Sequence, residues 1–436
     1  MEREEDISIE NYGPQMYSLI EDLFPICRSI TGDGVRKTLR YIQEHLPELR
    51  IHEVPTGERC LDWEIPKEWN ISDAYVQDET GKKIIDFSEH NLHVVNYSIP
   101  VNKEMSLREL DSHLHSFPDK PDVIPYVTSY YEPRWGFCLP HRQREELKDG
   151  LYKVRIESTL DVGSLTYADL LIPGKTKEEI LVSTYVCHPS MANNELSGPA
   201  VATYLSKWIL AQNDRKYSYR IVFIPETIGA IAYLSRNLVE MKENTVAGYV
   251  LTCVGDNRCY SYMPSRRGDS LADKAALHCL NHKIESYEAY SFADRGSDER
   301  QYCAPGVDLP VCSVMRSKYG EYPEYHSSDD DLSLISADGL QGSIDAHVDI
   351  LKMLEANETY IATNLGEPQL SRRKLRPSLG AARVSTPHVK LVSNLLAYAD
   401  GTMDLIDIAN EIGVYVLDLV PVVETLLDHE LISLAD

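Results

Sequence analysis

The sequence predicts an α/β protein built on a doubly wound, mostly parallel sheet, with an inserted β-rich domain and a C-terminal winged helix. Three observations lead to this fold class. Strand-like and helix-like runs alternate after residue 160, short strand-like runs and turns fill residues 57–160, and three helical patterns follow residue 386. Strands that alternate with helices form parallel sheets with helices on both faces.

The first 56 residues are expected to hold two helices joined by a tight turn. Apolar positions recur at helical spacing through residues 15–47, around a Thr-Gly-Asp-Gly break. From residue 57 to residue 160, runs such as DAYVQD, KKIIDF and NLHVVNYSI alternate with Pro, Asn and Gly. This texture is typical of β-structure, so we assign residues 57–160 to an inserted β-rich domain.

The following segments are expected to complete the α/β domain, which we assign to residues 1–56 and 161–366. Four apolar runs of strand length and four runs of helical length succeed one another. The expected strands are 178–186, 219–225, 248–255 and 309–315, and the expected helices are 198–212, 229–244, 269–283 and 336–357. In such sheets, ligands bind at the carboxyl ends of the strands.

The last block is assigned to a winged helix-turn-helix domain of residues 380–436. Its helical patterns are broken at Gly401 and Gly413 and end in a short apolar tail. The helix that would enter a DNA groove carries Asp418, Glu424 and Asp428. Because these acids repel phosphates, we expect a packing or partner module and no nucleic-acid partner.

Composition excludes several classes of function. The 436-residue chain has a formal net charge of −25, which disfavours binding to nucleic acids and to acidic membranes. The N-terminal stretch has no signal-peptide pattern, and no apolar run reaches the roughly 18 residues of a spanning helix. We therefore expect a cytoplasmic protein without a membrane partner, with homo-oligomers left open. Nine scattered cysteines without a C-x-x-C pair favour reduced core thiols.

Polar side chains of metal-binding and acid–base type follow the expected strands. His188 ends the run ILVSTYVC, and Glu226 follows the second strand in PETIG. Asp298 in RGSDERQYCAPG and His326 in YPEYHSSDDDL come later. Each has a simpler structural explanation when taken alone, such as a helix N-cap for Asp298. Their shared position at strand ends favours one site.

Together these residues resemble the zinc exopeptidases of the bacterial leucyl aminopeptidase type. The segment MANNELSG, residues 191–198, is similar to the family pattern G-A-N-D-N-x-S-G. The resemblance covers residues 20–56 and 162–358 and implies a zinc exopeptidase-like fold. The chain most resembles a group of bacterial aminopeptidase-like proteins with an inserted β-domain and a C-terminal winged helix.

The resemblance implies roles for four of the residues. His188 stands for the first metal-binding His, Asp298 for the later Asp, His326 for the last His, and Glu226 for the general base. We therefore expect a zinc ion bound by His188, Asp298 and His326. Zinc would lower the pKa of its water toward roughly 7, and Glu226 would pass the proton to the leaving amine.

Two positions depart from the family pattern. Asn194 stands where the family has its bridging Asp, and Thr227 stands where it has a second metal-binding Glu. Neutral groups bring no negative charge to offset two divalent cations, so we expect one ion. In an alternative ligand set, the amide oxygen of Asn194 joins His188 and Asp298, and His326 holds the oxyanion.

The expected function is metal-dependent hydrolysis of amide bonds, first of all by a zinc aminopeptidase, a metalloprotease acting on small peptides or amides. Two alternatives stay open: an N-acyl amidohydrolase acting on a sugar or amino-acid conjugate, and a non-catalytic binding or scaffold protein on a degenerate peptidase fold. Candidate substrate-binding or supporting residues are Asn194, the acids Glu195, Glu299 and Glu324 for an ammonium group, the bases Arg295, Arg300, Arg316 and Lys318 for a carboxylate, and Tyr325 as a pocket wall.

Overall fold

The computed structural model describes residues 11–375 and 387–435. They form two compact units: one comprises the residues up to Asp273 with Tyr287–Asp345, and the other comprises Lys274–Ser286 with the residues from Ala346 onward. All nine cysteines are free thiols. Among the described helices, none is both long and apolar enough to cross a lipid bilayer.

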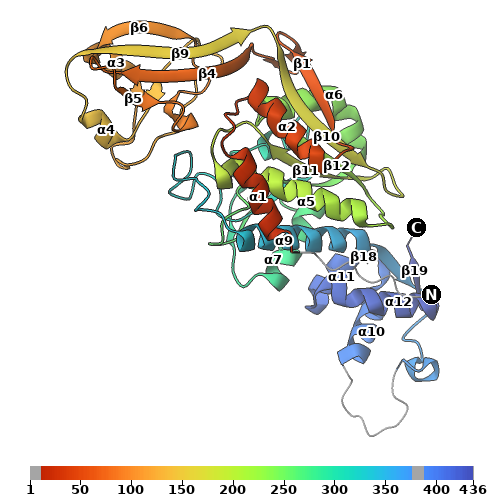
Figure 1. Cartoon of the computed structure of the whole chain (residues 1–436). Helices are drawn as coiled ribbons and strands as arrows, with labels where there is room; N and C mark the ends of the chain where they lie inside the picture. The colour runs from red at the N-terminus through yellow and green to blue at the C-terminus, as the bar shows by residue number, and fades with distance from the viewer. Residues whose placement is uncertain (1–10, 376–386, 436) are drawn as a thin grey trace. The chain divides into compact units, whose positions relative to one another are not determined.

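An eight-stranded sheet forms the framework of the first unit (Figure 1). Its order is β1-β10-β12-β11-β13-β16-β14-β15, and the four strands β12, β11, β13 and β16 run parallel, with antiparallel pairs toward the edges. The predicted α/β class is confirmed. The strands are β1 (Arg50–Pro55), β10 (Ser164–Ile172), β11 (Glu179–Tyr185), β12 (Ser218–Ile224), β13 (Thr245–Val250), β14 (Ser261–Met263), β15 (Glu288–Ala289) and β16 (Val311–Met315).

The chain order reverses at β11, and this reversal places helices on opposite faces of the sheet. The connection from β11 to β12 passes through α5, and the connection from β12 back across β11 to β13 passes through α6. Right-handed crossovers in opposite directions put these two helices on different faces. The helices are α1 (Gly13–Leu23), α2 (Asp33–His45), α5 (Ser197–Ala211), α6 (Ile228–Asn244), α7 (Leu271–Lys283), α8 (Glu299–Tyr302) and α9 (Ala337–Ala356).

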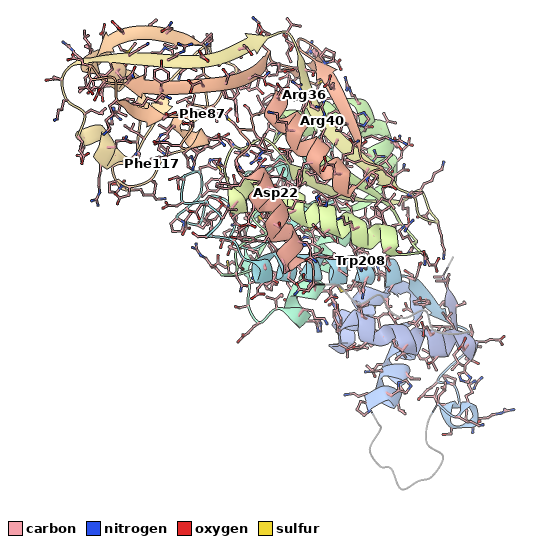
Figure 2. All side chains as sticks on the ribbon, in the orientation of Figure 1. Asp22, Arg36, Arg40, Phe87, Phe117 and Trp208 are labelled. Atoms are coloured by element: carbon pink, nitrogen blue, oxygen red, sulfur yellow. The ribbon has the colours of Figure 1, made fainter. Side chains whose placement is uncertain are left out.

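Helix α5 begins tightly against the sheet because its first turn contains Gly198. A Cβ at this position would lie 2.3 Å from the carbonyl oxygen of Leu251 and 2.4 Å from Oγ1 of Thr184, closer than real Cβ atoms approach. The helix is buried along most of its length, including Trp208 near its end (Figure 2). This close start holds the preceding loop at the carboxyl end of β11.

A separate antiparallel sheet of order β5-β4-β9-β6 is formed by strands between residues 68 and 161. The chain leaves the central sheet after β1 and re-enters it at β10, the strand that pairs with β1. Strand β9 alternates exposed and buried residues, as a strand with one face on a core does. Both sheets belong to the same compact unit, so the predicted domain boundaries stay a prediction. The insertion contains β2 (Arg59–Cys60), β3 (Trp63–Glu64), β4 (Glu68–Gln77), β5 (Lys83–Asp86), β6 (Val101–Ser106), α3 (Leu107–Leu110), β7 (Leu114–His115), β8 (Phe137–Cys138), α4 (His141–Glu145) and β9 (Leu151–Asp161).

In the second unit, the described residues from Thr359 onward form three short helices and a sheet of order β18-β17-β19, as a winged helix does. Asp404 caps α11 by accepting a bond from the amide of Asp407, and Gly413 ends that helix in the left-handed conformation. Glu424 and Asp428 are exposed on α12, whereas Asp418, which the sequence placed on the same helix, is exposed in the 3-10 turn η6 (Val416–Leu419) before it. Strand β17 precedes residue 380, where the sequence placed the start of this domain. The elements are β17 (Thr359–Ala362), α10 (Pro387–Tyr398), β18 (Asp400–Asp404), α11 (Leu405–Ile412), α12 (Val420–Asp428) and β19 (Ile432–Leu434).

Candidate functional site

The carboxyl ends of β11 and β12 bring His188 and Glu226 together. The two strands are parallel neighbours, with Tyr185 opposite Ile224, and the amide of Val186 donates to the carbonyl oxygen of Ile224 at 2.8 Å. Beyond this point the Nε2 atom of His188 lies 3.6 Å from Oε2 of Glu226. This edge lies where the chain order of the sheet reverses, the place where open α/β sheets bind ligands.

The imidazole of His188 is held between two carboxylates. Its Nδ1 atom lies 2.8 Å from Oε2 of Glu195, and its Nε2 atom faces Glu226. Burial lowers the pKa of His188, but the hydrogen bond and charge of Glu195 outweigh burial and raise it. A carboxylate on Nδ1 directs the Nε2 lone pair outward, which is the usual arrangement of a metal-binding histidine. His188 is only 4% exposed.

The buried side chain of Arg28 supports the carboxylate of Glu195. Glu195 lies in the π-helical turn η3 (Ala192–Leu196), and its Oε1 atom is 3.6 Å from Nε of Arg28. Arg28 also donates from Nε to the carbonyl oxygen of His188 at 3.0 Å. Burial lowers the pKa of Arg28, and the charge of Glu195 opposes that shift. No sequence pattern indicated Arg28, which comes from the loop between α1 and α2.

Asp298 lies beside Glu226 and is fully buried. Its Oδ1 atom accepts the amide hydrogen of Thr227 at 2.7 Å, and Thr227 has a positive φ of 64°. Asp298 occupies the N-cap position of α8 but makes no capping bond with its side chain. Burial raises the pKa of Asp298 well above its usual value, and the charge of Glu226 adds to the rise. Burial also raises the pKa of Glu226, opposed by His188.

His326 faces His188, with ring centroids 5.4 Å apart. Its backbone is left-handed, with a φ of 53°, and its ring stacks on Tyr325 at 3.9 Å. Burial lowers the pKa of His326 to about 3, and the charge of His188 adds to that effect, so the imidazole is neutral. A neutral imidazole is the form that binds metal ions.

The inserted segment contributes Tyr126 to this site. The ring of Tyr126 packs at 5.2 Å against the rings of both His188 and His326. Its amide donates to the carbonyl oxygen of His326 at 2.9 Å, and Pro125 pairs with Ser327 in an antiparallel bridge. The insertion therefore fixes the loop that carries His326. Nothing in the sequence around Tyr126 indicated this role.

The loop that carries Asn194 is fixed by Asp330. The fully buried carboxylate accepts the amides of Asn193 at 2.6 Å and Asn194 at 3.0 Å, and the hydroxyl of Tyr322 at 2.7 Å. Burial raises the pKa of Asp330 to about 6. The side-chain amide of Asn194 donates to the hydroxyl of Tyr185 at 2.7 Å. Its Oδ1 atom therefore points away from that bond.

The side chains at this edge include donor groups of the kinds that bind metal ions. Several buried atoms lack a hydrogen-bond partner within the described parts of the chain, among them Oδ1 of Asn194, Oε1 of Glu195, Oδ2 of Asp298 and Nε2 of His326. Buried polar atoms nearly always have a partner, so such a cluster calls for one. Imidazole nitrogen and carboxylate oxygen are ligands of catalytic zinc, and an amide oxygen is a weaker donor of the same kind.

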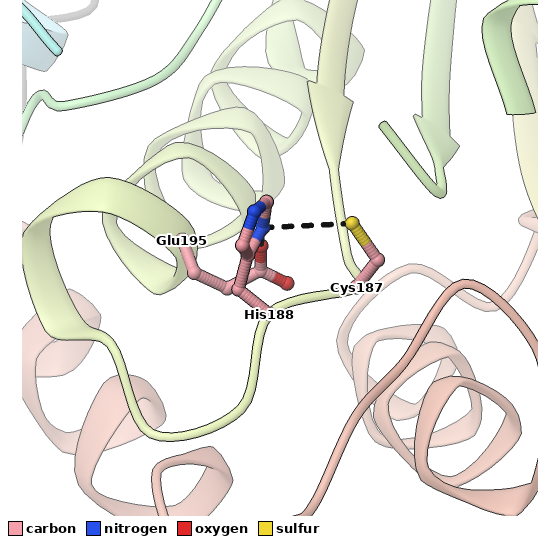
Figure 3. Close-up of side chains that lie close together, drawn as sticks. All are labelled: Cys187, His188 and Glu195. Atoms are coloured by element: carbon pink, nitrogen blue, oxygen red, sulfur yellow. Dashed lines mark hydrogen bonds and ion pairs between the residues drawn. The ribbon is translucent and has the colours of Figure 1, made fainter. Parts of the chain in front are cut away.

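The tightest cluster of ligand-type side chains is a different set. In the described residues, Cys187, His188 and Glu195 have ligand atoms that all lie within 4.8 Å of one another, whereas the predicted trio of His188, Asp298 and His326 forms no such set (Figure 3). Burial raises the pKa of the Cys187 thiol well above its usual value, and its Sγ atom accepts the amide of Glu226 at 3.2 Å. We therefore interpret Cys187 as structural, and the ligand set stays a prediction.

Arg295 stays outside the site. Its guanidinium is exposed, packs on the ring of Phe292 at 4.8 Å and donates to the carbonyl oxygen of the same residue. By contrast, Glu195 bonds to His188, and Asp298 accepts the amide of Thr227. The side chain of Asn194 bonds to Tyr185. Tyr325 stacks on the predicted ligand His326, whereas Arg295 has no contact with the predicted ligands among the described residues.

Known proteins resemble this chain along nearly its whole length. Residues 17–357 match the model described as "Domain of unknown function (DUF4910)", and residues 358–434 match one described as winged helix-turn-helix. A protein of Clostridium acetobutylicum named "Putative polysaccharide biosynthesis protein with aminopeptidase-like domain" is 47% identical over 402 residues, 92% of each chain. The predicted resemblance to aminopeptidase-like proteins with a C-terminal winged helix is confirmed.

Solved structures share the fold. The crystal structure of a "putative peptidase" from Clostridium acetobutylicum is 45% identical, with a TM-score of 0.91, and covers 97% of this chain and 96% of its own. BSAP, a zinc aminopeptidase from Bacillus subtilis, is 12% identical, with a TM-score of 0.57, over 78% of this chain and 94% of its own. The predicted zinc exopeptidase-like fold is therefore confirmed.

Proposed function

This chain belongs to the family described as a domain of unknown function, DUF4910, and from that premise we propose that it is a zinc-dependent hydrolase of amide bonds in small substrates. One observation carries the proposal. His188 is buried between the carboxylates of Glu195 and Glu226 at the switch point of the sheet, and its ring faces that of His326, whose Nε2 atom lacks a partner in the described residues. Such an arrangement is typical of a catalytic metal site.

His188, Asp298 and His326 would hold one ion, with Asn194 as the alternative to His326. When bound, zinc supplies Lewis-acid activation of the substrate carbonyl and of water. Glu195 keeps the ring of His188 oriented through Nδ1 at 2.8 Å. Tyr126 covers the two histidine rings and keeps solvent from that side.

Glu226 is the general base of the proposed reaction. Its side chain is 22% exposed, so a substrate and water can reach it, whereas Asp298 is closed off. Burial raises its pKa, and a base works best when its pKa lies close to the working pH. Its carboxylate would take a proton from water and deliver that proton to the nitrogen of the leaving amine.

The printed name of the relative from Clostridium acetobutylicum, which mentions polysaccharide biosynthesis, favours a second substrate class. That class is the N-acyl group of a sugar or amino-acid conjugate. Hydrolysis of such a conjugate needs the same water, base and metal ion as hydrolysis of a peptide. Only the groups that bind the two halves of the substrate differ.

The variant Glu226→Gln tests the proposal. Gln keeps the shape but cannot accept a proton, so turnover should fall by roughly 10²–10⁴-fold while the metal stays bound. The assay follows acid or amino-acid release from aminoacyl and N-acyl amides, with metal measured on the same samples. Glu178→Gln, at an exposed position before β11, is the matched control. Loss of metal with activity would make Glu226 a ligand, and unchanged hydrolysis would exclude both roles.

A further inference from the structure

The three acids that could have bound a substrate ammonium group are already engaged. Glu195 contacts His188 and Arg28 and is 1% exposed. Glu299 is fully buried and accepts the amides of Gly296 and Ser297, each at 3.0 Å. Glu324 forms a two-pronged ion pair with Arg258, at 2.9 and 2.8 Å. One oxygen each of Glu195 and Glu299 lacks a hydrogen-bond partner in the described residues, but both side chains are closed off from solvent, so none of the three acids presents a carboxylate to a ligand from solvent.

Of the four bases that could bind a carboxylate, two are also engaged. Arg316 is 4% exposed, donates to the carbonyl oxygen of Asp256 at 2.7 Å and stacks on Tyr260 at 4.0 Å. Lys318 is 5% exposed and donates to the carbonyl oxygen of Tyr319 at 3.0 Å. With Arg295 outside the site, Arg300 is the base left to consider.

Arg300 is exposed and lies beside the proposed base. Its Nη2 atom donates to Oγ1 of Thr227, the residue that follows Glu226. Within residues 11–375 and 387–435, Arg300 forms no ion pair. Its helix α8 starts next to Asp298, whose carboxylate accepts the amide of Thr227 at 2.7 Å. Burial raises the pKa of Glu226, and the charge of Arg300 opposes the rise, as expected for close neighbours.

We infer that Arg300 binds a carboxylate on the leaving-amine half of the substrate, so that the site acts on N-acyl amino acids. The inference rests on the proposed amide hydrolysis. Glu226 protonates the leaving nitrogen, and Arg300 is anchored one residue from Glu226, so the guanidinium faces that half. A guanidinium can bind a carboxylate through two parallel bonds, and one of its edges is already fixed by Thr227.

The reaction balances without a further reactant. The oxygen of water bonds to the acyl carbon, the C–N bond breaks, and the nitrogen leaves with the proton that Glu226 transfers. The products are a carboxylic acid and a free amino acid. The α-carboxylate of that amino acid stays on Arg300 through bond cleavage, so its binding energy contributes to KM and to orientation of the scissile bond.

The test compares N-acetyl amino acids with the matching N-acetyl amino acid amides on the metal-loaded protein, by acetate release. We expect Arg300→Gln to lower kcat/KM for the acids by roughly 10–100-fold, mainly through KM, because a charged hydrogen bond is lost. The amides should change little. Arg300→Lys should restore part of the loss, and Arg295→Gln, an exposed arginine nearby, should have no effect.

Every other outcome either supports or overturns the inference about Arg300. An equal loss on acids and amides would overturn the inference, because Arg300 would then only position Glu226 or Asp298. Hydrolysis of acids and amides at the same rate by the unmodified protein would overturn it as well. If neither is hydrolysed, amino-acid release from aminoacyl amides decides the proposed function separately, and calorimetric titration with N-acetyl amino acids decides the inference. Binding that Arg300→Gln abolishes supports it, and absent or unchanged binding overturns it.

Discussion

Replacing Glu195 by Gln is expected to destabilise the fold by about 3–5 kcal/mol, because it leaves the charge of Arg28 buried without a partner. Glu195 and Arg28 are 1% and 0% exposed, and their charged atoms lie 3.6 Å apart. At an effective dielectric constant of about 20, two unit charges at 3.6 Å attract each other by about 5 kcal/mol, which agrees with that range. Because Gln has nearly the same shape as Glu, the substitution removes the charge and keeps the shape of the site.

The same substitution also weakens the metal site. The amide oxygen of Gln can still accept a bond from Nδ1 of His188, but it brings no negative charge to the ring. Loss of such a supporting carboxylate typically costs 10–100-fold in metal affinity. We therefore expect Glu195→Gln to lose both stability and metal affinity. A purely structural role for this ion pair would lower the stability alone.

Urea unfolding of the metal-free protein and metal titration of the folded protein measure the two effects. Arg28→Met is the companion variant, and the double variant Arg28→Met/Glu195→Gln removes both charges together. Since the two side chains interact directly, the double variant should be more stable than the sum of the single losses predicts, by about 2 kcal/mol or more. A Glu195→Gln protein within about 1 kcal/mol of the unmodified protein would refute this reasoning.

Three further outcomes are expected. Tyr126→Ala should lower kcat/KM by roughly tenfold or more, because the ring of Tyr126 contacts both histidines. Tyr126→Phe keeps the ring and should retain activity. Equal losses for the two variants in steady-state assays would contradict this. Glu68→Gln should cost about 0.5–1 kcal/mol at pH 7, and this cost should decline as pH falls below the ordinary pKa of a glutamate and vanish only below the lowered pKa of Glu68. Burial opposes but does not outweigh the bond from Arg36, which lowers the pKa of Glu68, so the stability is present at neutral pH and disappears as pH falls. Chemical unfolding across pH measures this loss. Duplex DNA should not bind at low salt, because the exposed face of α12 is acidic; a shift in a gel-mobility assay that weakens with salt would contradict this.

Local sequence patterns sufficed to predict the α/β class and the contact of His188 with Glu226. Both residues follow apolar runs of strand length, and parallel neighbouring strands bring their carboxyl ends to one edge. Such positions can be predicted because strand and loop alternation is a local property. The pairing of β1 with β10 across the insertion is a long-range contact and has no local signature.

The supporting residues could not be predicted for the same reason. Arg28 reaches the site from a loop 160 residues before His188, and Tyr126 reaches it from the insertion. Asp330 is the buried member of an acidic run whose composition is that of a solvated turn. Arg295 and Arg300 are both exposed arginines of one segment, and only the position of α8 distinguishes them.

The metal content of the protein, purified without chelator and before any metal is added, tests the central claim most directly. We expect about one zinc ion per chain, and a His188→Ala protein that is folded but has lost most of that metal, since His188 lies in a loop outside the strands. Absence of metal from the folded, unmodified protein would contradict the assignment of the site. Two fully occupied ions would contradict the single-ion interpretation of Asn194 and Thr227.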